Sequence, residues 1–589
     1  MLSALFRITP SGFAGFTFAA LAFFVIPSFA GSLWLSVFTS TACFTLATAG
    51  VAFMYARLGM VSLTQVGLMG IGGWVMLRVN YAFGLPFEIS LLIAAVTTML
   101  CGMLLALPAL RLRGLYLALV TLMAAGGLEI LFATFQFPNG GSGFWGVQTG
   151  LTPKFQRPQW AISDADYLRY TVFFATVGFI LIELTGRLTP GRAWALIRRS
   201  EAAAMAAGVN VTRYKTIAFA LSGLLGGIAG ALLAGSLGLL DGQTFRASES
   251  VLLFALAVVG GARFWLGAVI AAALFRILPA LLNNWGVDAD LSFVIFGAGL
   301  LHAVITAPNG IAGQLYSALG KLRSVAAVTP DVSHASRLPA PGVIAAPLNT
   351  QINVNNISVK FGGVLALDNV SACFTKPVSG IIGPNGAGKT TLMNVFSGFV
   401  QAEQGTIDLS GKTLEPLSPY RRSQWGLRRS FQKEEIATDL TVADNILVQL
   451  DGQGYSISQK QEELERVLDI VSLTSMAKVP GAQLNNYQRR LTDVAKCLVG
   501  KPKVILFDEP AGGLSVEETN TLGQLILNIH KHTGVQTLVI DHDVDLIKRI
   551  CEETLVLDFG KCIAFGPTKQ VLDDPRVKAA YLGNEEVDT

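Results

Sequence analysis

Long apolar runs fill the first part of the chain, up to about residue 310. A helix needs roughly 20 mostly apolar residues to cross the hydrocarbon core of a bilayer, and a run of about 18 is already a candidate. About ten such runs follow one another, the eighth of them short: 12–31, 33–56, 58–80, 87–110, 114–136, 168–189, 214–240, 251–263, 264–283 and 291–308. They predict a polytopic α-helical membrane domain with about ten transmembrane helices. Two glycine-rich stretches within them, GLMGIGGW and VVGGARFWLG, are candidates for broken or re-entrant helices.

The composition agrees with a membrane location. The chain is 52% hydrophobic and only 14% charged, about half the charged fraction of ordinary soluble domains. Its net charge of +4 is too small and too dispersed to indicate nucleic acid as a partner. The six cysteines show no CxxC pair and no metal-ligand spacing, so we expect reduced thiols. The first apolar run lacks a cleavage pattern after it and is expected to be a retained span.

The basic residues predict the orientation of the spans. With the N-terminus inside, the cytoplasmic turns hold Arg7, Arg57, Arg111, Arg113, Arg192, Arg198, Arg199, Arg213, Lys215 and Arg263. The external turns hold fewer, namely Arg78, Lys154, Arg157, Arg169 and Arg246. Because Lys and Arg concentrate in cytoplasmic loops, both termini are expected in the cytoplasm, together with everything after residue 320.

The pattern changes near residue 320. Residues 1–320 form the expected membrane domain, and 321–350, rich in Ala, Ser, Val and Pro, read as a linker. From 351 to 589 charge returns, and short apolar strands such as SGIIG, KVILFDE and QTLVIDH alternate with helical stretches. This alternation predicts a soluble α/β domain.

The strongest motif of the chain is IIGPNGAGKTTL, in which residues 383–390 fit G-x-x-x-x-G-K-[ST] between a strand and a helix. Small residues let backbone N–H groups curl around phosphates, and the helix N-terminus adds its positive dipole end. Lys389 supplies a cation, and the Thr390 hydroxyl can coordinate Mg²⁺. The cofactors expected are ATP and Mg²⁺. The nucleotide-binding residues expected in this loop are Gly383, Pro384, Asn385, Gly386, Ala387, Gly388, Lys389, Thr390 and Thr391.

A second motif, KVILFDEP at 503–510, complements the first. Its apolar residues predict a buried strand from whose end two acids emerge. Asp508 is expected to hold Mg²⁺ through water, and Glu509 to polarise an attacking water as general base.

With these two motifs, the cytoplasmic half resembles the ATPase of an ABC transporter. Phe361 matches the aromatic residue that stacks on adenine, and Gln432 matches the Q-loop glutamine that touches the metal site. Residues 512–519, GGLSVEET, fill the D-loop position, although Ser515 stands where Asp is common. His542, in LVIDHDVDLI, matches the switch histidine that contacts the γ-phosphate. The resemblance thus implies Glu509, His542 and Gln432 as catalytic residues, and Thr390, Gln432 and Asp508 around the metal.

Longer stretches narrow the resemblance. RSFQKEEIATDLTVADNILV and DDPRVKAAYLGNEE resemble the LivG-type ATPases of branched-chain amino acid importers. LPALRLRGLYLALVTL, NGGSGFWGV and GRAWALIRRSEAAAMAAGVNVTRYKTIAFALSGLLGGIAGAL resemble the LivM-type permease of the same system. The chain therefore resembles a fusion of permease and ATPase in a bacterial cytoplasmic membrane. The resemblance implies a second permease and ATPase pair of LivH and LivF type, either fused or made as separate chains, and an extracytoplasmic solute-binding protein.

Two further interpretations concern the membrane half. The resemblance assigns residues 201–208 as a coupling helix that docks near the Q-loop; the alternative is an exposed turn at the membrane surface. Glu129, Glu183 and Arg276 fall within the expected spans, where ionisable groups are costly and often functional. Membrane lipid surrounds this half as its expected partner.

One motif departs from the family pattern. The signature L-S-G-G-Q is expected about twenty residues ahead of VILFDEP, where this chain reads LNNYQ. Without gaps, Asn485 takes the place of serine, Asn486 and Tyr487 replace the glycines, and Gln488 is kept. Glycine lets a backbone approach a phosphate where a Cβ would intrude. We therefore expect a weakened contact with the partner's ATP, an intact site on this chain, and a heteromeric complex.

Three functions remain open from the sequence. The first is ATP-driven uptake of branched-chain or other hydrophobic amino acids. The second keeps the same machine with urea, short amides or small carboxylates as cargo. The third, an ABC exporter or lipid flippase, is disfavoured because exporter halves usually have six long helices with extended cytoplasmic portions.

Overall fold

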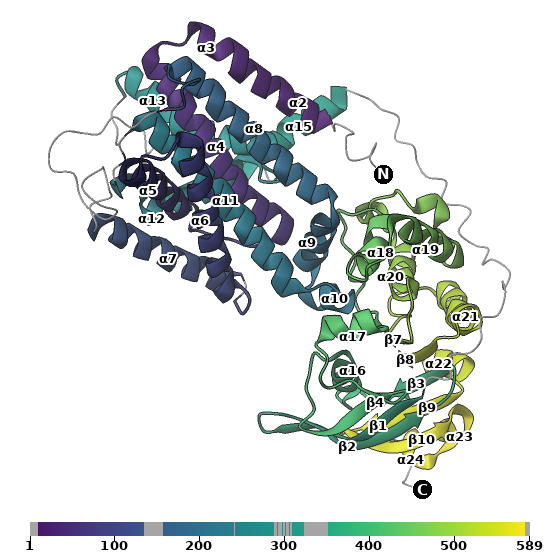
Figure 1. The fold of residues 1–589 in the computed structure, drawn as a ribbon. Helices are drawn as coiled ribbons and strands as arrows, with labels where there is room; N and C mark the ends of the chain where they lie inside the picture. Colours follow the sequence, from purple (N-terminus) through teal and green to yellow (C-terminus); the bar gives the residue numbers. More distant parts are fainter. Residues whose placement is uncertain are drawn as a thin grey trace. The chain divides into compact units, whose positions relative to one another are not determined.

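The computed structural model describes residues 10–112, 114–134, 157–238, 240, 242–287, 309–322 and 351–582, with a few positions between 291 and 306. The chain divides into two compact units (Figure 1). The first comprises Met1–Trp194 and Thr212–Ala327, and the second comprises Ala195–Val211 and Val328–Thr589. A short stretch of the permease half, 195–211, therefore belongs to the unit that contains the α/β domain. Residues 323–350, most of the expected linker, lie outside the described residues.

The first unit is helical. Its described elements are α2 (Pro10–Ala20), η1 (Leu21–Val25), α3 (Ile26–Phe29), α4 (Ser32–Leu58), α5 (Gln65–Phe83), α6 (Phe87–Ala109), α7 (Leu115–Thr134), α8 (Asp164–Arg187), α11 (Val211–Leu237), η2 (Gly242–Phe245), α12 (Ala247–Gly260), α13 (Trp265–Asn284) and α15 (Gly310–Leu322), and α9 (Thr189–Arg199) continues into the second unit. Within the described residues, α4, α6, α7, α8, α11 and α13 are long and apolar enough to cross a membrane.

The remaining predicted spans correspond to shorter helices or lie outside the described residues. The first run corresponds to α2, η1 and α3, the third to α5, and the eighth to the short apolar α12. Residues 59–64 precede α5 without helical structure, so the third run begins later than predicted. The tenth run, 291–308, falls largely outside the described residues. The fold class, a helical membrane domain joined to an α/β ATPase domain, is confirmed, with about six long apolar helices.

Glycines in α5 allow this helix to pack closely against α11. The prediction of a broken helix at GLMGIGGW is wrong, because this stretch lies inside the continuous helix α5. A Cβ on Gly72 would lie 2.4 Å from the carbonyl oxygen of Gly227 in α11, and a Cβ on Gly230 would lie 1.9 Å from that of Met69. The small residues therefore let two backbones approach closely, as membrane helices often do.

The break expected in VVGGARFWLG is present. Helix α12 ends at Gly260, and Gly261 adopts a φ of 107° that disfavours any residue with a side chain. Helix α13 begins at Trp265. A Cβ on Gly267 would lie 2.1 Å from the Gly261 carbonyl oxygen, so this turn is tightly packed.

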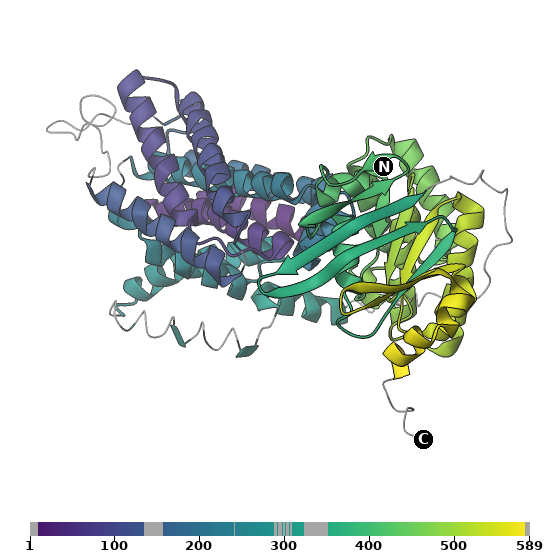
Figure 2. The same ribbon diagram turned by 90° about the horizontal axis from the view of Figure 1, so that it is seen from below.

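The second unit contains two sheets, whose strands are visible in Figures 1 and 2. The antiparallel sheet has the order β2-β1-β4-β5, with β1 (Ile352–Phe361), β2 (Val364–Phe374), β4 (Gln404–Leu409) and β5 (Lys412–Thr413). The second sheet has the order β10-β9-β3-β8-β7-β6, with β3 (Val378–Ile382), β6 (Leu427–Arg429), β7 (Val504–Asp508), β8 (Gln536–Ile540), β9 (Glu553–Asp558) and β10 (Lys561–Pro567). Its pairings are parallel except that of β9 with β10.

The second unit also contains helices. They are α10 (Glu201–Ala206), α16 (Lys389–Ser397), α17 (Pro419–Trp425), α18 (Val442–Asp451), α19 (Ile457–Ile470), η4 (Thr474–Met476), η5 (Gly481–Gln483), α20 (Asn486–Leu498), α21 (Val516–Thr533), α22 (Val544–Ile550), α23 (Thr568–Asp573) and α24 (Pro575–Leu582). Strands β3, β7 and β8 are buried at every position, as expected of parallel strands covered on both faces. One apolar cluster lies between the two sheets and another beneath the helices.

Candidate functional site

Three neighbouring parallel strands deliver the motif residues to one edge of the second sheet. Strand β8 lies between β3 and β7 and runs parallel to both. The P-loop follows β3, Asp508 ends β7, and Asp541 and His542 follow β8. Because the carboxyl ends of parallel strands form a common edge, segments more than 120 residues apart in sequence meet there, in the usual place for a ligand in an α/β sheet.

The P-loop owes its shape to its glycines. Gly386 and Gly388 have φ values of 81° and 99°, a conformation that costs other residues energy. A Cβ on Gly388 would lie 2.7 Å from the Ala366 carbonyl oxygen, whereas one on Gly386 would point into open space. Gly388 therefore seats the loop against the domain, and Gly386 lies at its open side. Gly388, at the N-cap of α16, has no side chain to bond the first N–H groups of that helix.

Lys389 is held inside this loop. It is 6% exposed, and its Nζ donates hydrogen bonds to the carbonyl oxygens of Gly383 at 2.7 Å and Pro384 at 2.9 Å. Burial lowers the pKa of Lys389, while the nearby Glu509 and Asp508 oppose this shift. Asn385 and Thr390 are exposed, Ala387 is buried, and Thr391 is half-buried on the first turn of α16.

Asp508 forms a buried ion pair that the sequence reading did not identify. Its Oδ2 accepts a hydrogen bond at 2.8 Å from Nη2 of Arg429, and both side chains are about 5% exposed. Arg429 also donates to Asn394 Oδ1 at 2.7 Å. Burial lowers the pKa of Arg429, and Asp508 opposes that shift. The sequence feature that could have indicated this ion pair is the two arginines in LRRSFQ, just ahead of the Q-loop. They lie on strand β6, beside β7.

The three residues expected to act in catalysis come together around one carboxylate. Gln432 Nε2 donates a hydrogen bond to Oε2 of Glu509 at 2.6 Å, and His542 Nε2 lies 2.8 Å from Oε1. Glu509 adopts a φ of 48°, in the left-handed region, and its N–H donates to the Ile540 carbonyl oxygen at 2.8 Å. Strained backbone of this kind persists where the surrounding structure holds it, often at functional sites.

The outlying motif residues lie at the ends of secondary-structure elements. Phe361 ends β1 and is 52% exposed. In the D-loop, Ser515 is the N-cap of α21, and its side chain accepts a hydrogen bond from the Glu518 N–H while Glu518 bonds the Ser515 N–H. Serine is a favoured N-cap residue, which explains why the helix begins normally without the usual Asp.

The altered signature also forms a helix N-cap. The side chain of Asn485 accepts a hydrogen bond from the Gln488 N–H at 2.8 Å, and Oε1 of Gln488 accepts one from the Asn485 N–H at 3.1 Å. Asn485 and Asn486 are exposed. Tyr487 is half-buried and packs against the apolar cluster beneath the helices, and burial raises its pKa. The tyrosine ring is thus partly accommodated by the core of the domain.

Residues 195–211 make a second cluster of contacts within this unit. Ser423 Oγ in α17 donates a hydrogen bond to the carbonyl oxygen of Ala206 at 2.5 Å, and Gln424 Nε2 donates to that of Gly208 at 2.9 Å. Ala206 is the last residue of α10 and Gly208 follows its C-cap, so α17 caps the C-terminal end of α10. The same stretch carries two ion pairs, Arg198 with Asp439 and Arg199 with Glu435, the latter at 3.0 Å.

The ionisable residues expected within the spans have partners. Glu129 Oε2 accepts a hydrogen bond at 2.9 Å from the Ala247 N–H, at the beginning of α12. Glu183 pairs with Arg187 at 2.8 Å and lies 4.0 Å from Arg57. Arg276 donates to Ser40 Oγ at 3.1 Å and lies over the ring of Phe44. Each of the three groups therefore has at least one polar partner within the helical unit.

Comparison with known proteins explains this combination. Residues 33–304 match the family described as "Branched-chain amino acid transport system / permease component", and residues 367–512 match the "ABC transporter" family. The ATPase region is 33% identical over 248 residues to the high-affinity branched-chain amino acid transport ATP-binding protein BraF of Pseudomonas aeruginosa, and 34% identical over 248 residues to LivG of Escherichia coli. Each alignment covers 39% of this chain and 97% of the relative.

The chain belongs to the branched-chain amino acid ABC transporter family. It joins the permease and the ATPase of that family in one polypeptide, and it is a membrane protein whose nucleotide-binding domain couples ATP hydrolysis to transport as part of a complex. The ATPase region of this transporter is also 32% identical over 211 residues to the lipopolysaccharide export system ATP-binding protein LptB of Acidithiobacillus ferridurans, covering 36% of this chain and 87% of that relative. Likeness of the ATPase alone therefore does not identify the cargo.

Proposed function

We propose that this chain drives the uptake of branched-chain or other hydrophobic amino acids across the bacterial cytoplasmic membrane. The observation that carries the proposal is the joint match of the two halves. The permease half matches the branched-chain amino acid permease family, and the ATPase half is similar to ATPases named for the same transport. Import is the direction that we propose, because the sequence of both halves resembles the importer of this system and no exporter-type membrane domain is matched by the permease half.

In this proposal the P-loop holds the phosphates of ATP. The uncapped N-terminus of α16 and the left-handed glycines at 386 and 388 present N–H groups to an anion. Lys389 exchanges its two carbonyl partners for phosphate oxygens, and Phe361 stacks on the adenine. The residues proposed to line the nucleotide are those predicted from the motif, 383–391.

Mg²⁺ fits the same site only together with a nucleotide. Among the described residues, no group of three or more His, Cys, Asp or Glu side chains is placed to hold a metal. This agrees with a cation bound by few protein ligands and by substrate phosphates, as is usual for Mg²⁺. Thr390 offers its hydroxyl, Asp508 its carboxylate, and Gln432 its carbonyl oxygen, since its amide nitrogen is used by Glu509. When bound, Mg²⁺ would neutralise phosphate charge.

Glu509 is proposed as the general base. Gln432 and His542 hold its two carboxylate oxygens, which positions the group to accept a proton from water. His542 is also proposed to contact the γ-phosphate. The ion pair of Arg429 with Asp508 fixes the neighbouring acid in its buried place.

Residues 201–208 are proposed as the coupling helix. They stem from the permease half of the sequence and pack within the ATPase unit, where α17 caps α10. Ala204 is fully buried, whereas Ala202, two positions earlier, is half-buried. Ala204→Arg should uncouple ATP hydrolysis from uptake, with Ala202→Arg as the matched control. Unchanged transport in the Ala204 variant would contradict the assignment.

The orientation and the partners complete the proposal. The bias of basic residues favours both termini in the cytoplasm. A second permease and ATPase pair of LivH and LivF type, either fused or made as separate chains, would complete the complex, and an extracytoplasmic solute-binding protein would deliver the substrate. The altered signature favours such an unequal pair, since a homodimer would carry the change at both ATP sites.

The unequal pair can be tested separately from the substrate. Restoring Ser-Gly-Gly at 485–487 in the assembled complex should raise ATP turnover at the site whose P-loop belongs to the partner. The stability of this variant must be measured alongside, because Tyr487 packs against the core. A folded variant with unchanged turnover would argue against a functional defect in the signature.

The substrate is tested by reconstitution. The complex is purified in mild detergent, its partner chains are identified, and uptake into proteoliposomes is measured with the binding protein encoded beside this gene. Leucine-dependent uptake that requires ATP supports the proposal. Uptake of urea, short amides or small carboxylates in its place would favour the second function, and ATP-dependent efflux would favour an exporter.

A further inference from the structure

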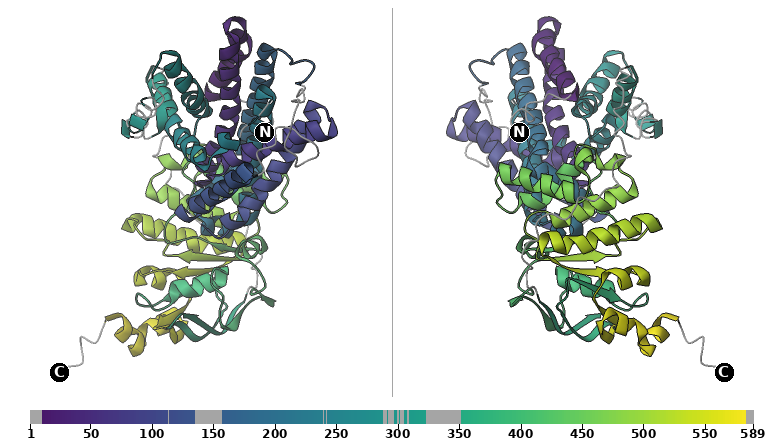
Figure 3. Two further views of the ribbon diagram at one scale, coloured as in Figure 1. Left: turned by 90° about the vertical axis from the view of Figure 1, so that its left-hand side faces the viewer. Right: turned by 90° about the vertical axis from the view of Figure 1, so that its right-hand side faces the viewer.

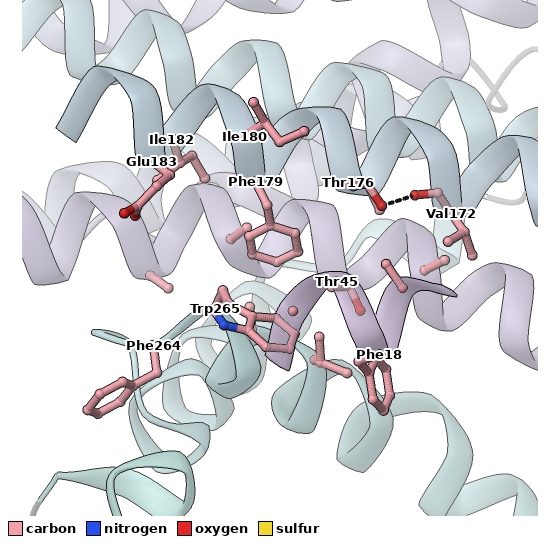
Figure 4. Close-up of a pocket in the computed structure, with 18 of the residues that line it drawn as sticks. Phe18, Thr45, Val172, Thr176, Phe179, Ile180, Ile182, Glu183, Phe264 and Trp265 are labelled. Carbon is pink, nitrogen blue, oxygen red and sulfur yellow. Dashed lines mark hydrogen bonds between the residues drawn. The ribbon is translucent and has the colours of Figure 1, made fainter. Parts of the chain in front are cut away.

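A long apolar groove lies within the helical unit, between α2, α4, α8 and α13. Its volume is about 650 Å³, within the range of roughly 300–1,000 Å³ that is typical of ligand clefts. Its wall on α4 extends from Phe38 to Arg57, which at about 1.5 Å per residue corresponds to about 28 Å, close to the thickness of a bilayer core. Figure 4 shows part of this groove, and Figure 3 shows the helices of this unit, coloured from purple (α2 and α4) through blue (α8) to teal (α13).

Charge gathers at one end of the groove. Among the described residues that line it, the charged side chains are Arg57, Glu183, Arg187 and Arg263. Arg57 and Glu183 lie 4.0 Å apart near the ends of α4 and α8, so these helices end on the same side. Arg263 precedes α13 and makes no ion pair with the residues the structure describes. Three positive charges against one negative leave this end with an excess of two.

The rest of the groove contains hydroxyls that are already used. Thr41 donates to the Val37 carbonyl oxygen, Thr45 to that of Thr41, and Thr176 to that of Val172, each at 2.8 Å. Figure 4 shows Phe18, Phe179 and Trp265 along the same groove. A zwitterionic amino acid would have its ammonium group next to apolar walls without a charged partner, which is costly. The apolar walls of the groove are therefore suited to a hydrocarbon chain.

We propose that this groove binds one anionic phospholipid, with an acyl chain along α4 and α8 and its headgroup at Arg57, Arg187 and Arg263. Basic pockets between transmembrane helices on the cytoplasmic side are known to favour anionic headgroups. Trp265, at the same end, has the amphipathic ring that is common at the membrane interface. The assignment of the headgroup to the cytoplasmic leaflet rests on the proposed orientation of the chain. The proposed lipid site does not depend on that orientation.

The test measures lipid retention by the purified full-length complex with native mass spectrometry. Phosphatidylglycerol and phosphatidylcholine with the same acyl chains are titrated in parallel. We expect one phosphatidylglycerol to be retained preferentially, and R57Q/R263Q to weaken its retention roughly 30-fold, since each basic residue contributes to anionic-lipid binding. Arg169→Gln, which removes a charge at the opposite end of α8, is the matched control.

A second variant tests the acyl-chain site. Thr176→Trp places a large ring in the groove from a half-buried position and should abolish retention while leaving the melting temperature of the complex nearly unchanged. Equal retention of the two lipids, or retention that survives both R57Q/R263Q and Thr176→Trp, would overturn the proposal. These results are independent of ATP hydrolysis and of the cargo, so they leave the proposed transport function to its own test.

Discussion

The N-termini of helices α16 and α20 in the ATPase unit differ in how their first backbone N–H groups are satisfied. Helix α16 begins after Gly388, which has no side chain, so its first N–H groups are left for a ligand. Helix α20 begins after Asn485, whose side chain and that of Gln488 satisfy each other's backbone N–H groups. Both termini carry the same dipole. The first terminus therefore has no side-chain cap, as the proposed phosphate site requires, while the second is stabilised by its own residues.

Their surroundings differ in the same way. Around α16, Lys389, Asp508 and Glu509 bring charged groups to the end of three strands, and burial shifts the pKa of Lys389 downward. Around α20, the tyrosine of the signature packs into the apolar cluster. We therefore expect substitutions near α16 to change chemistry more than stability, and substitutions at the start of α20 to change stability more than the chemistry of this chain's own site.

The largest effect is expected for Glu509→Gln. Loss of the proposed general base should lower ATP hydrolysis by about 10²- to 10⁴-fold, while nucleotide binding persists because the P-loop is unchanged. Phosphate release by the assembled complex measures the rate. Glu462→Gln, at an exposed glutamate on α19, is the matched control and should leave the rate unchanged. Substantial residual hydrolysis would remove Glu509 from its proposed role.

The second effect is expected for Lys389→Ala. Removing a charged donor from the P-loop should weaken ATP binding by about 10- to 100-fold, the effect typical of a hydrogen bond to a charged group. Fluorescent nucleotide titration of the full chain measures the affinity, with the exposed Lys531→Ala on α21 as control. Equal affinity of the two variants would show that the uncapped helix and the glycines suffice for binding.

The ATP site was more accessible to sequence reasoning than the permease. The sequence predicts the buried strands that precede Gly383 and Asp541 and the strand that ends in Asp508, and the resemblance implies catalytic roles for Glu509 and His542. The contact of Glu509 with His542 and the ion pair of Arg429 with Asp508 were not predicted, because the partners of each are 33 and 79 residues apart and meet only through neighbouring strands. In the permease, the sequence does not distinguish a glycine that ends a helix from a glycine that lets two helices pack closely. The structure shows that Gly72 has the packing role, because α5 lies close to α11 at this residue.

The third prediction turns to α20. Tyr487→Gly removes a half-buried ring and adds glycine to a helix, which together should cost roughly 2 kcal/mol of unfolding free energy. The melting temperature of the full chain should fall by several degrees. Tyr487→Phe keeps the ring and serves as control. An unchanged melting temperature would mean that the tyrosine contributes little to the core, leaving steric hindrance at the signature as its main consequence.

The smallest effect is expected for Asn485→Ala, and it tests the comparison most directly. Loss of an N-cap side chain typically costs about 1 kcal/mol, because one N–H of the first turn loses its partner. Asn485→Ser should restore most of this, since serine caps nearly as well as asparagine, and Asn486→Ala, one position inside the helix, should be close to neutral. Denaturant unfolding measures all three. If Asn485→Ala were instead neutral in stability and lowered ATP turnover at this chain's own P-loop, the start of α20 would act on chemistry, and the contrast between the two helix termini would fail.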